Sequence, residues 1–158
     1  MDHKKLGMVK NIFHSLTDME LVMLHFAGDM SMWGFSSAYK DAQLHVQCSY
    51  RFTCEDQTLL CREDIHTIVN QEKFGTLLHT ERDLLAMYLF PLRVKEVAVQ
   101  ENQDLTISFQ DDFALHIYAD LPIMDEQWRF WIHPQEPEEW EQQIVAADGK
   151  MKIQKIRP

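Results

Sequence analysis

The segment that decides the fold of this chain is Leu44-His45-Val46-Gln47-Cys48-Ser49-Tyr50-Arg51-Phe52. Apolar side chains stand at every second position of it, and His45, Gln47, Ser49 and Arg51 fill the positions between them. Successive side chains of a strand point to opposite faces, so this alternation predicts a long strand over 43–53 with one apolar and one polar face. We therefore expect an architecture based on a β-sheet.

The rest of the chain repeats this pattern between short turns. Strands are predicted at 9–14, 19–26, 58–62, 94–99, 105–109, 113–117 and 127–133. Asp148-Gly149 stands between two apolar runs and predicts a C-terminal hairpin over 142–156. Glu55-Asp56-Gln57 and Asp111-Asp112 are predicted to form turns between neighbouring strands. Turns this short force the strands they join to run antiparallel.

One principal helix is predicted over about 81–90, with Thr80 as its N-cap and Pro91 at its end. The expected fold class is α+β and β-rich: a mainly antiparallel curved sheet, a sandwich or a partly open barrel, with that one helix. The chain has 158 residues and no Pro-rich or Gly-rich linker. We expect a single domain over 1–158, with the core sheet and helix in 9–134.

Composition places the chain among globular proteins, since hydrophobic residues make up 46% of it. The sequence has no apolar run of the ~18 residues that a membrane span needs, and no signal peptide follows Met1. We expect a cytoplasmic protein that does not bind membranes. Cys48, Cys54 and Cys61 are odd in number and not closely paired, which favours reduced thiols and argues against a metal site.

The net charge of −10 is unevenly distributed along the chain. Residues 101–149 contain twelve acidic side chains against Arg129 alone, a net −11, whereas residues 150–158 carry Lys150, Lys152, Lys155 and Arg157, a net +4. A negative field disfavours nucleic acid and anionic membranes, and it attracts a basic protein partner. Solubility alone is the simpler explanation of the same charge.

The segment 27–40 interrupts the strand pattern and is rich in large apolar side chains. We expect a loop that either folds back over the core or offers a contact surface through Trp33 and Phe35. Trp131 is expected to point outward from its strand, where it either marks an interface, since exposed Trp is enriched at interface hot spots, or is covered by the C-terminal hairpin. The candidate partner-binding residues are Trp33, Phe35, Trp131, Glu136, Glu138 and Glu139.

A candidate polar site combines His45, Arg51, Asp64 and His116. These residue types suffice for acid–base chemistry with an anion clamp. However, six residues of strand separate His45 from Arg51 by ~20 Å. A structural Arg51–Asp64 ion pair is therefore the competing interpretation. The sequence has no HExxH, P-loop or nucleophile-elbow motif, so no catalytic residue, cofactor or metal is predicted.

Four landmarks resemble a family of small, uncharacterised bacterial proteins. They are Asp18-Met19 with Phe26-Ala27-Gly28, then 44–51, then Asp64, then Trp128-Arg129-Phe130. In that family a "DM…FG" strand precedes "LHVQCPWR", a "D-L" step and an "hWRL" strand. This chain has Ser49-Tyr50 in place of Pro-Trp, and Ala27 is inserted before Gly28. The resemblance spans roughly residues 10–134 and implies one bacterial domain that is similar to immunity proteins of toxin systems.

These observations leave functions of different classes open. The first is a non-catalytic binding protein that neutralises a basic protein partner, as a toxin-immunity protein does. The second is a small-ligand binder or enzyme with a polar sheet-face site around His45, Arg51 and His116. A homo-oligomeric structural protein is a third. The lack of catalytic motifs favours the first.

Overall fold

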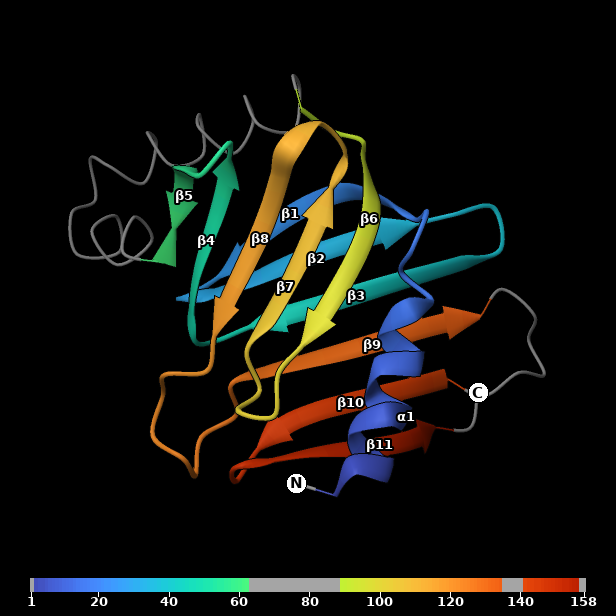
Figure 1. The fold of residues 1–158 in the computed structure, drawn as a ribbon, viewed down its shortest axis with the longest axis vertical. Coiled ribbons are helices and arrows are strands. Elements are labelled where there is room, and N and C mark those ends of the chain that lie inside the picture. Colours follow the sequence, from blue (N-terminus) through green and yellow to red (C-terminus); the bar gives the residue numbers. More distant parts are fainter. Residues whose placement is uncertain (1, 63–88, 135–140, 157–158) are drawn as a thin grey trace.

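The computed structural model describes residues 2–62, 89–134 and 141–156 (Figure 1). Within them the chain forms one α-helix, one short 3-10 turn and eleven β-strands. In chain order these are α1 His3–His14, β1 Glu20–Ala27, β2 Met30–Ser36, β3 Lys40–Val46, β4 Ser49–Cys54, β5 Gln57–Cys61, β6 Leu92–Val99, β7 Leu105–Phe109, η1 Gln110–Asp112, β8 Phe113–Tyr118, β9 Trp128–Pro134, β10 Glu141–Ala147 and β11 Lys150–Ile156.

All strand pairs are antiparallel, and the strand order is β11-β10-β9-β3-β2-β1-β6-β7-β8-β4-β5. The joint between β1 and β6 is narrow, because only Glu20↔Arg93 and Leu21↔Leu92 are paired there. The sheet bends at this joint into a first layer (β1–β3 and β9–β11) and a second layer (β4–β8). In Figure 1, β4 and β6–β8 cross in front of β1–β3, and α1 lies in front of β9–β11. The predicted β-rich, curved antiparallel fold is confirmed.

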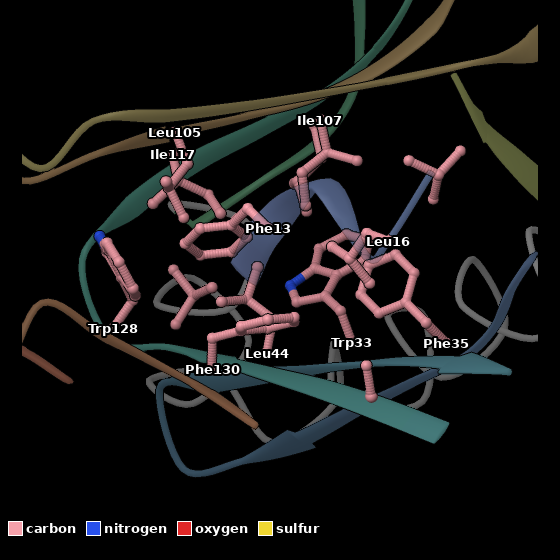
Figure 2. Close-up of a cluster of buried hydrophobic side chains, with 14 of the residues drawn as sticks. Phe13, Leu16, Trp33, Phe35, Leu44, Leu105, Ile107, Ile117, Trp128 and Phe130 are labelled. Atoms are coloured by element: carbon pink, nitrogen blue, oxygen red, sulfur yellow. The ribbon is translucent and has the colours of Figure 1, made fainter. Parts of the chain in front are cut away.

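The hydrophobic core lies between the two layers (Figure 2). Side chains of the second layer point toward those of the first, and Phe13 of α1 lies between them. The labelled core residues are Phe13, Leu16, Trp33, Phe35, Leu44, Leu105, Ile107, Ile117, Trp128 and Phe130. The outer faces of the two layers consequently point away from each other.

The predicted strand at 9–14 is wrong, because these residues belong to α1. Leu6, Val9 and Phe13 are spaced three and four residues apart, so a helix places all three on one buried face. Asp2 caps the helix by accepting a hydrogen bond from the Lys4 backbone N–H at 3.0 Å.

The alternation over 44–52 is confirmed, but it serves two strands in different layers. The chain leaves β3 at Gln47 and Cys48, whose backbone N–H groups both donate to the Gln127 carbonyl, at 2.9 and 3.2 Å. Leu44, on β3, and Phe52, on β4, still reach the same core. The period of two continues across the break, so one stretch supplies buried side chains to both layers.

The predicted loop at 27–40 is also wrong in part, since Met30–Ser36 forms β2. Ala27 pairs with Met30, which leaves Gly28-Asp29 as a two-residue turn. Gly28 has a φ of 62°, a conformation that glycine adopts without steric cost.

The other predicted hairpins are confirmed. Glu55-Asp56 joins β4 to β5, and Asp148-Gly149 joins β10 to β11. The predicted helix at 81–90 falls largely on residues 63–88, outside the described residues. Among the residues that the structure describes, α1 is too short and too polar to cross a lipid bilayer.

Candidate binding surfaces

The outer face of the second layer brings Arg51 and His116 together. Arg51 on β4 is the cross-strand partner of His116 on β8, and His116 is in turn the partner of Thr106 on β7. His116 Nε2 lies 3.4 Å from the Thr53 hydroxyl. The imidazole is also stacked with Tyr118, with ring centroids 6.4 Å apart. This face therefore presents a row of polar and aromatic groups.

His45 does not join this row. It lies on β3 of the first layer, on the face directed away from the core. The predicted site around His45, Arg51 and His116 is therefore divided between two opposite faces, and only Arg51 and His116 lie together. Asp64 lies outside the described residues, so the proposed Arg51–Asp64 pair stays a prediction.

Two turns adjoin at one end of the second layer, and both are acidic. The Glu55 backbone N–H donates to the Asp112 carbonyl at 3.1 Å, which holds the β4–β5 turn beside the β7–β8 turn. Glu55, Asp56, Asp111 and Asp112 all have positive φ and are exposed. Desolvation and the carboxylates of Glu55, Asp112 and Asp111 raise the pKa of the neighbouring Cys54 thiol. The negative field of the turns thus extends over the end of β4.

These turns border an open concavity of about 500 Å³, here called the acidic groove. It is lined by Thr53, Glu55, Asp56, Lys95, Glu96, Ser108, Phe109, Asp112, Phe113, Ala114 and His116. Among the lining residues that the structure describes, four are acidic and only Lys95 carries a basic side chain of Lys or Arg type. The sequence predicts His116 as a candidate residue and also predicts both turns. It does not predict the groove, because the turns meet only through the pairing of β4 with β8.

The outer face of the first layer carries a connected polar network around Trp131. The ring of His45 meets Trp131 edge to face, with centroids 4.4 Å apart, and its Nε2 lies 3.2 Å from Gln43 Oε1. The Arg129 guanidinium lies 5.7 Å from the centre of the indole. Arg129 Nε also donates to Glu126 Oε1 at 2.5 Å.

Gln143 and Gln47 complete this network. With the Gln143 amide oriented to satisfy its neighbours, its oxygen accepts from Trp131 Nε1 at 2.9 Å and from an Arg129 Nη at 3.1 Å. Gln47 Nε2 donates to Glu126 at 3.0 Å. Each member of the network is thus held by another, which favours one arrangement of the side chains.

The environment of His45 predicts its titration. Burial lowers the pKa of His45 below 6.5, the charge of Arg129 lowers it further, and Glu126 opposes them. We expect an NMR titration to give a midpoint below 6.5 for His45 and a higher midpoint in Arg129→Gln. The folded state binds this proton less tightly than the unfolded chain does. His45 therefore contributes stability above pH 6.5 that is lost as the pH falls below this value. Arg93→Gln, far from His45 on β6, is the control, and equal midpoints in both variants would contradict the assignment.

The candidate partner-binding residues fall into three groups: buried, outward-facing, and outside the described residues. Trp33 and Phe35 are buried in the core, so their prediction as surface contacts is wrong. Trp131 faces outward as expected and is half-buried. Glu136, Glu138 and Glu139 lie outside the described residues. Trp33 and Phe35 of β2 are buried because the second layer packs over them. This long-range packing is not evident from the local sequence pattern.

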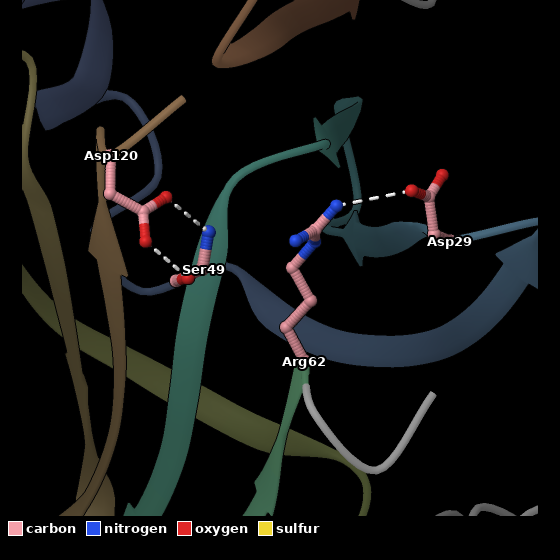
Figure 3. Close-up of polar contacts among 4 residues, drawn as sticks. All are labelled: Asp29, Ser49, Arg62 and Asp120. Atoms are coloured by element: carbon pink, nitrogen blue, oxygen red, sulfur yellow. Dashed lines mark hydrogen bonds and ion pairs between the residues drawn. The ribbon is translucent and has the colours of Figure 1, made fainter. Parts of the chain in front are cut away.

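A carboxylate fixes the point where β4 begins (Figure 3). Asp120 accepts hydrogen bonds from both the backbone N–H, at 3.0 Å, and the hydroxyl of Ser49. Burial alone raises the pKa of Asp120, but the Ser49 bonds and the nearby Arg62 charge outweigh it and lower the pKa. Arg62 itself donates to Asp29 at 3.0 Å, which links β5 to the β1–β2 turn. These contacts tie the ends of the two layers together.

The cysteines and the other candidate ligands do not form a reactive centre in the part of the chain that the structure describes. Cys48 is buried, and its burial, followed by the charge of Asp120, raises the pKa of its thiol to about 12. Across residues 2–62, 89–134 and 141–156, no group of three or more His, Cys, Asp or Glu side chains is arranged to hold a metal ion.

Comparison of the chain with protein-family models, with curated proteins and with solved structures gave no match. The resemblance to the bacterial family above therefore stays a prediction.

Proposed function

We propose that this protein is a non-catalytic binding protein that neutralises a basic protein partner, in the manner of a toxin-immunity protein. The observation that carries the proposal is the acidic groove. Within the described part of the chain it is bordered by Glu55, Asp56, Glu96 and Asp112, and Lys95 is the one lysine in its lining. Lys and Arg side chains of a partner would be attracted to this end of the second layer.

The floor of the groove supplies contacts besides charge. His116 and the hydroxyl groups of Thr53 and Ser108 lie beneath the acidic turns and are able to accept hydrogen bonds from an ammonium or guanidinium group. Beyond the groove, Tyr118 is exposed on the same face of β8 and stacked with His116, and its ring is available for a cation–π contact. Basic, planar and extended side chains fit these groups better than anionic ones do.

The alternative of a sheet-face enzyme loses its main support. It requires His45, Arg51 and His116 in one site, and His45 belongs to the other layer. Binding at the acidic groove does not require His45, so a binding role accounts for more of the observed geometry.

Neutralising the groove is expected to weaken partner binding about tenfold or more, since charge pairs at interfaces are worth on the order of 1 kcal/mol each. The partner is isolated by affinity capture from cells of the source organism at low salt, identified and purified. It is then titrated by calorimetry into the wild type and into Glu55→Gln/Asp56→Asn. Both replacements remove charge, and Asn tolerates the positive φ of position 56.

The matched control is Glu20→Gln/Glu101→Gln, which removes the same charge elsewhere on the surface. We expect the control to retain wild-type affinity and the groove variant to lose most of its salt dependence. An acidic partner, or equal losses in both double variants, would refute the proposal.

A further inference from the structure

The loop between β8 and β9 carries two exposed apolar side chains at its tip. Ile123 is 69% exposed and Met124 is 74% exposed. They occupy the two central positions of a turn that is closed by a hydrogen bond from the Asp125 N–H to the Pro122 carbonyl at 2.8 Å. The loop follows the end of β8 that is opposite to the acidic groove (Figure 1). It is therefore a surface separate from that groove.

The amide of the buried Gln127 holds this loop from within. Its Oε1 accepts from the Leu121 N–H at 3.0 Å, and its Nε2 donates to the Leu121 carbonyl at 3.0 Å and to the Pro122 carbonyl at 3.4 Å. The Gln127 backbone N–H donates to the Ala146 carbonyl at 2.8 Å. The base of the turn is thus attached to β10 of the first layer.

Hydrogen bonds also hold the first residues of the loop, Ala119 and Asp120. The Ala119 N–H donates to Asp104 Oδ1 at 2.8 Å, and the Asp120 carboxylate binds Ser49 as described above (Figure 3). At the tip, Ile123 lies against Gly149, where an added Cβ would approach its Cγ1 and Cδ1 to 3.0 Å. Ile123 and Met124 are therefore presented by an ordered turn rather than by a free loop.

The charge around the tip is negative. Asp120, Asp125 and Asp148 are exposed beside it. Of the nearby cations, Arg129 pairs with Glu126 and Lys152 lies 3.3 Å from Asp148. Lys150, exposed next to Gly149, is the third, so the four carboxylates of Asp120, Asp125, Glu126 and Asp148 remain in excess around the tip. A positively charged rim on a partner would complement this border, and an anionic lipid surface would be repelled by it.

We propose that Ile123 and Met124 form a docking tip for a protein partner that has an apolar pocket bordered by Lys or Arg side chains. Interface hot spots cluster in well-packed pockets from which water is excluded, and two large apolar side chains that enter such a pocket meet that condition. Because the turn is already ordered, binding would lose little conformational entropy. The inference concerns a surface that the acidic groove does not include and does not depend on the function proposed for that groove.

The test uses the full chain with a photo-cross-linking amino acid at position 124, and at position 39 as a control. Tyr39 is another strongly exposed large side chain, 79% exposed, in the turn between β2 and β3. Cross-linking is carried out in cells of the source organism. The protein joined through position 124 is identified, purified and titrated by calorimetry into the wild type, Ile123→Ser/Met124→Ser, Asp125→Asn and Tyr39→Ser.

We expect the double tip variant to raise the Kd about 30-fold or more, the factor that corresponds to a hot spot. Asp125→Asn should reduce the salt dependence of binding, and Tyr39→Ser should bind like the wild type. The inference is overturned if position 124 cross-links nothing beyond the position 39 control, or only a second copy of this chain. It is also overturned if the partner's contact surface is acidic, or if the wild type binds phosphatidylserine vesicles through the tip. The groove variant Glu55→Gln/Asp56→Asn, run in parallel, shows separately whether the groove contributes.

Discussion

Replacing Phe13 with alanine is expected to destabilise the protein by about 3–5 kcal/mol, the range measured for removal of a buried aromatic ring. The Phe13 ring is fully buried. It stacks on Phe130 with centroids 4.5 Å apart and meets Trp128 edge to face at 5.5 Å. In Figure 2 it lies between the two layers, so its removal leaves a cavity that both layers border. Urea denaturation followed by circular dichroism measures the change in the free energy of unfolding.

The matched control is Met8→Ala on the same helix. Met8 is 49% exposed, so its replacement keeps the helix and removes little buried surface. We expect this control to cost less than about 1 kcal/mol. If both variants lose the same small amount of stability, α1 does not contribute to the core in the way that the structure indicates.

This helix also shows why part of the fold could not be predicted from the sequence. Only Leu6, Val9 and Phe13 of its twelve residues are buried, and its first turn has no acidic side chain to favour it. Such a short helix is stable mainly through tertiary packing. Its partners, Trp128 and Phe130, come more than a hundred residues later in the chain. The local pattern around Val9 and Phe13 is short and fits a strand as readily as a helix.

The alternation over 44–52 predicts correctly which side chains are buried, but it does not predict that the chain passes from β3 to β4 within the segment. Alternation records only which side chains face the core, and that property is unchanged where the chain crosses between layers. The crossing depends on the Gln127 carbonyl, which receives both the Gln47 and the Cys48 N–H. This contact joins positions eighty residues apart, so no local pattern indicates it.

The candidate sites also combine features that a local sequence pattern shows with features that depend on long-range contacts. The turns at Glu55-Asp56 and Asp111-Asp112 are both evident in the sequence, because short acidic stretches separate apolar strands. Their meeting depends on the register of β4 with β8, which also places Arg51 opposite His116. The residue types and the turns can thus be predicted from the sequence, whereas the groove arises from long-range strand pairing.

Replacing Gln127 with leucine is expected to cost about 2–4 kcal/mol, even though the two side chains are similar in size. Gln127 is almost fully buried. Its amide satisfies the N–H and carbonyl of Leu121 and also reaches the Pro122 carbonyl. Leucine offers none of these bonds, and each backbone group left unpaired in a buried position costs about 1–3 kcal/mol. Urea denaturation gives the stability, and amide hydrogen exchange at Leu121 reports the loop directly.

Gln100→Leu is the control, because it makes the same replacement at an exposed side chain and should change stability by less than about 0.5 kcal/mol. In Gln127→Leu we expect faster exchange at Leu121, while the amides of β7 and β8 keep their protection. Wild-type exchange at Leu121 would show that Gln127 does not hold the loop. The variant retains Ile123 and Met124 but loses the group that orders the turn beneath them. Weaker docking by this variant would therefore assign part of the affinity to the preformed turn, because the apolar contacts themselves are unchanged.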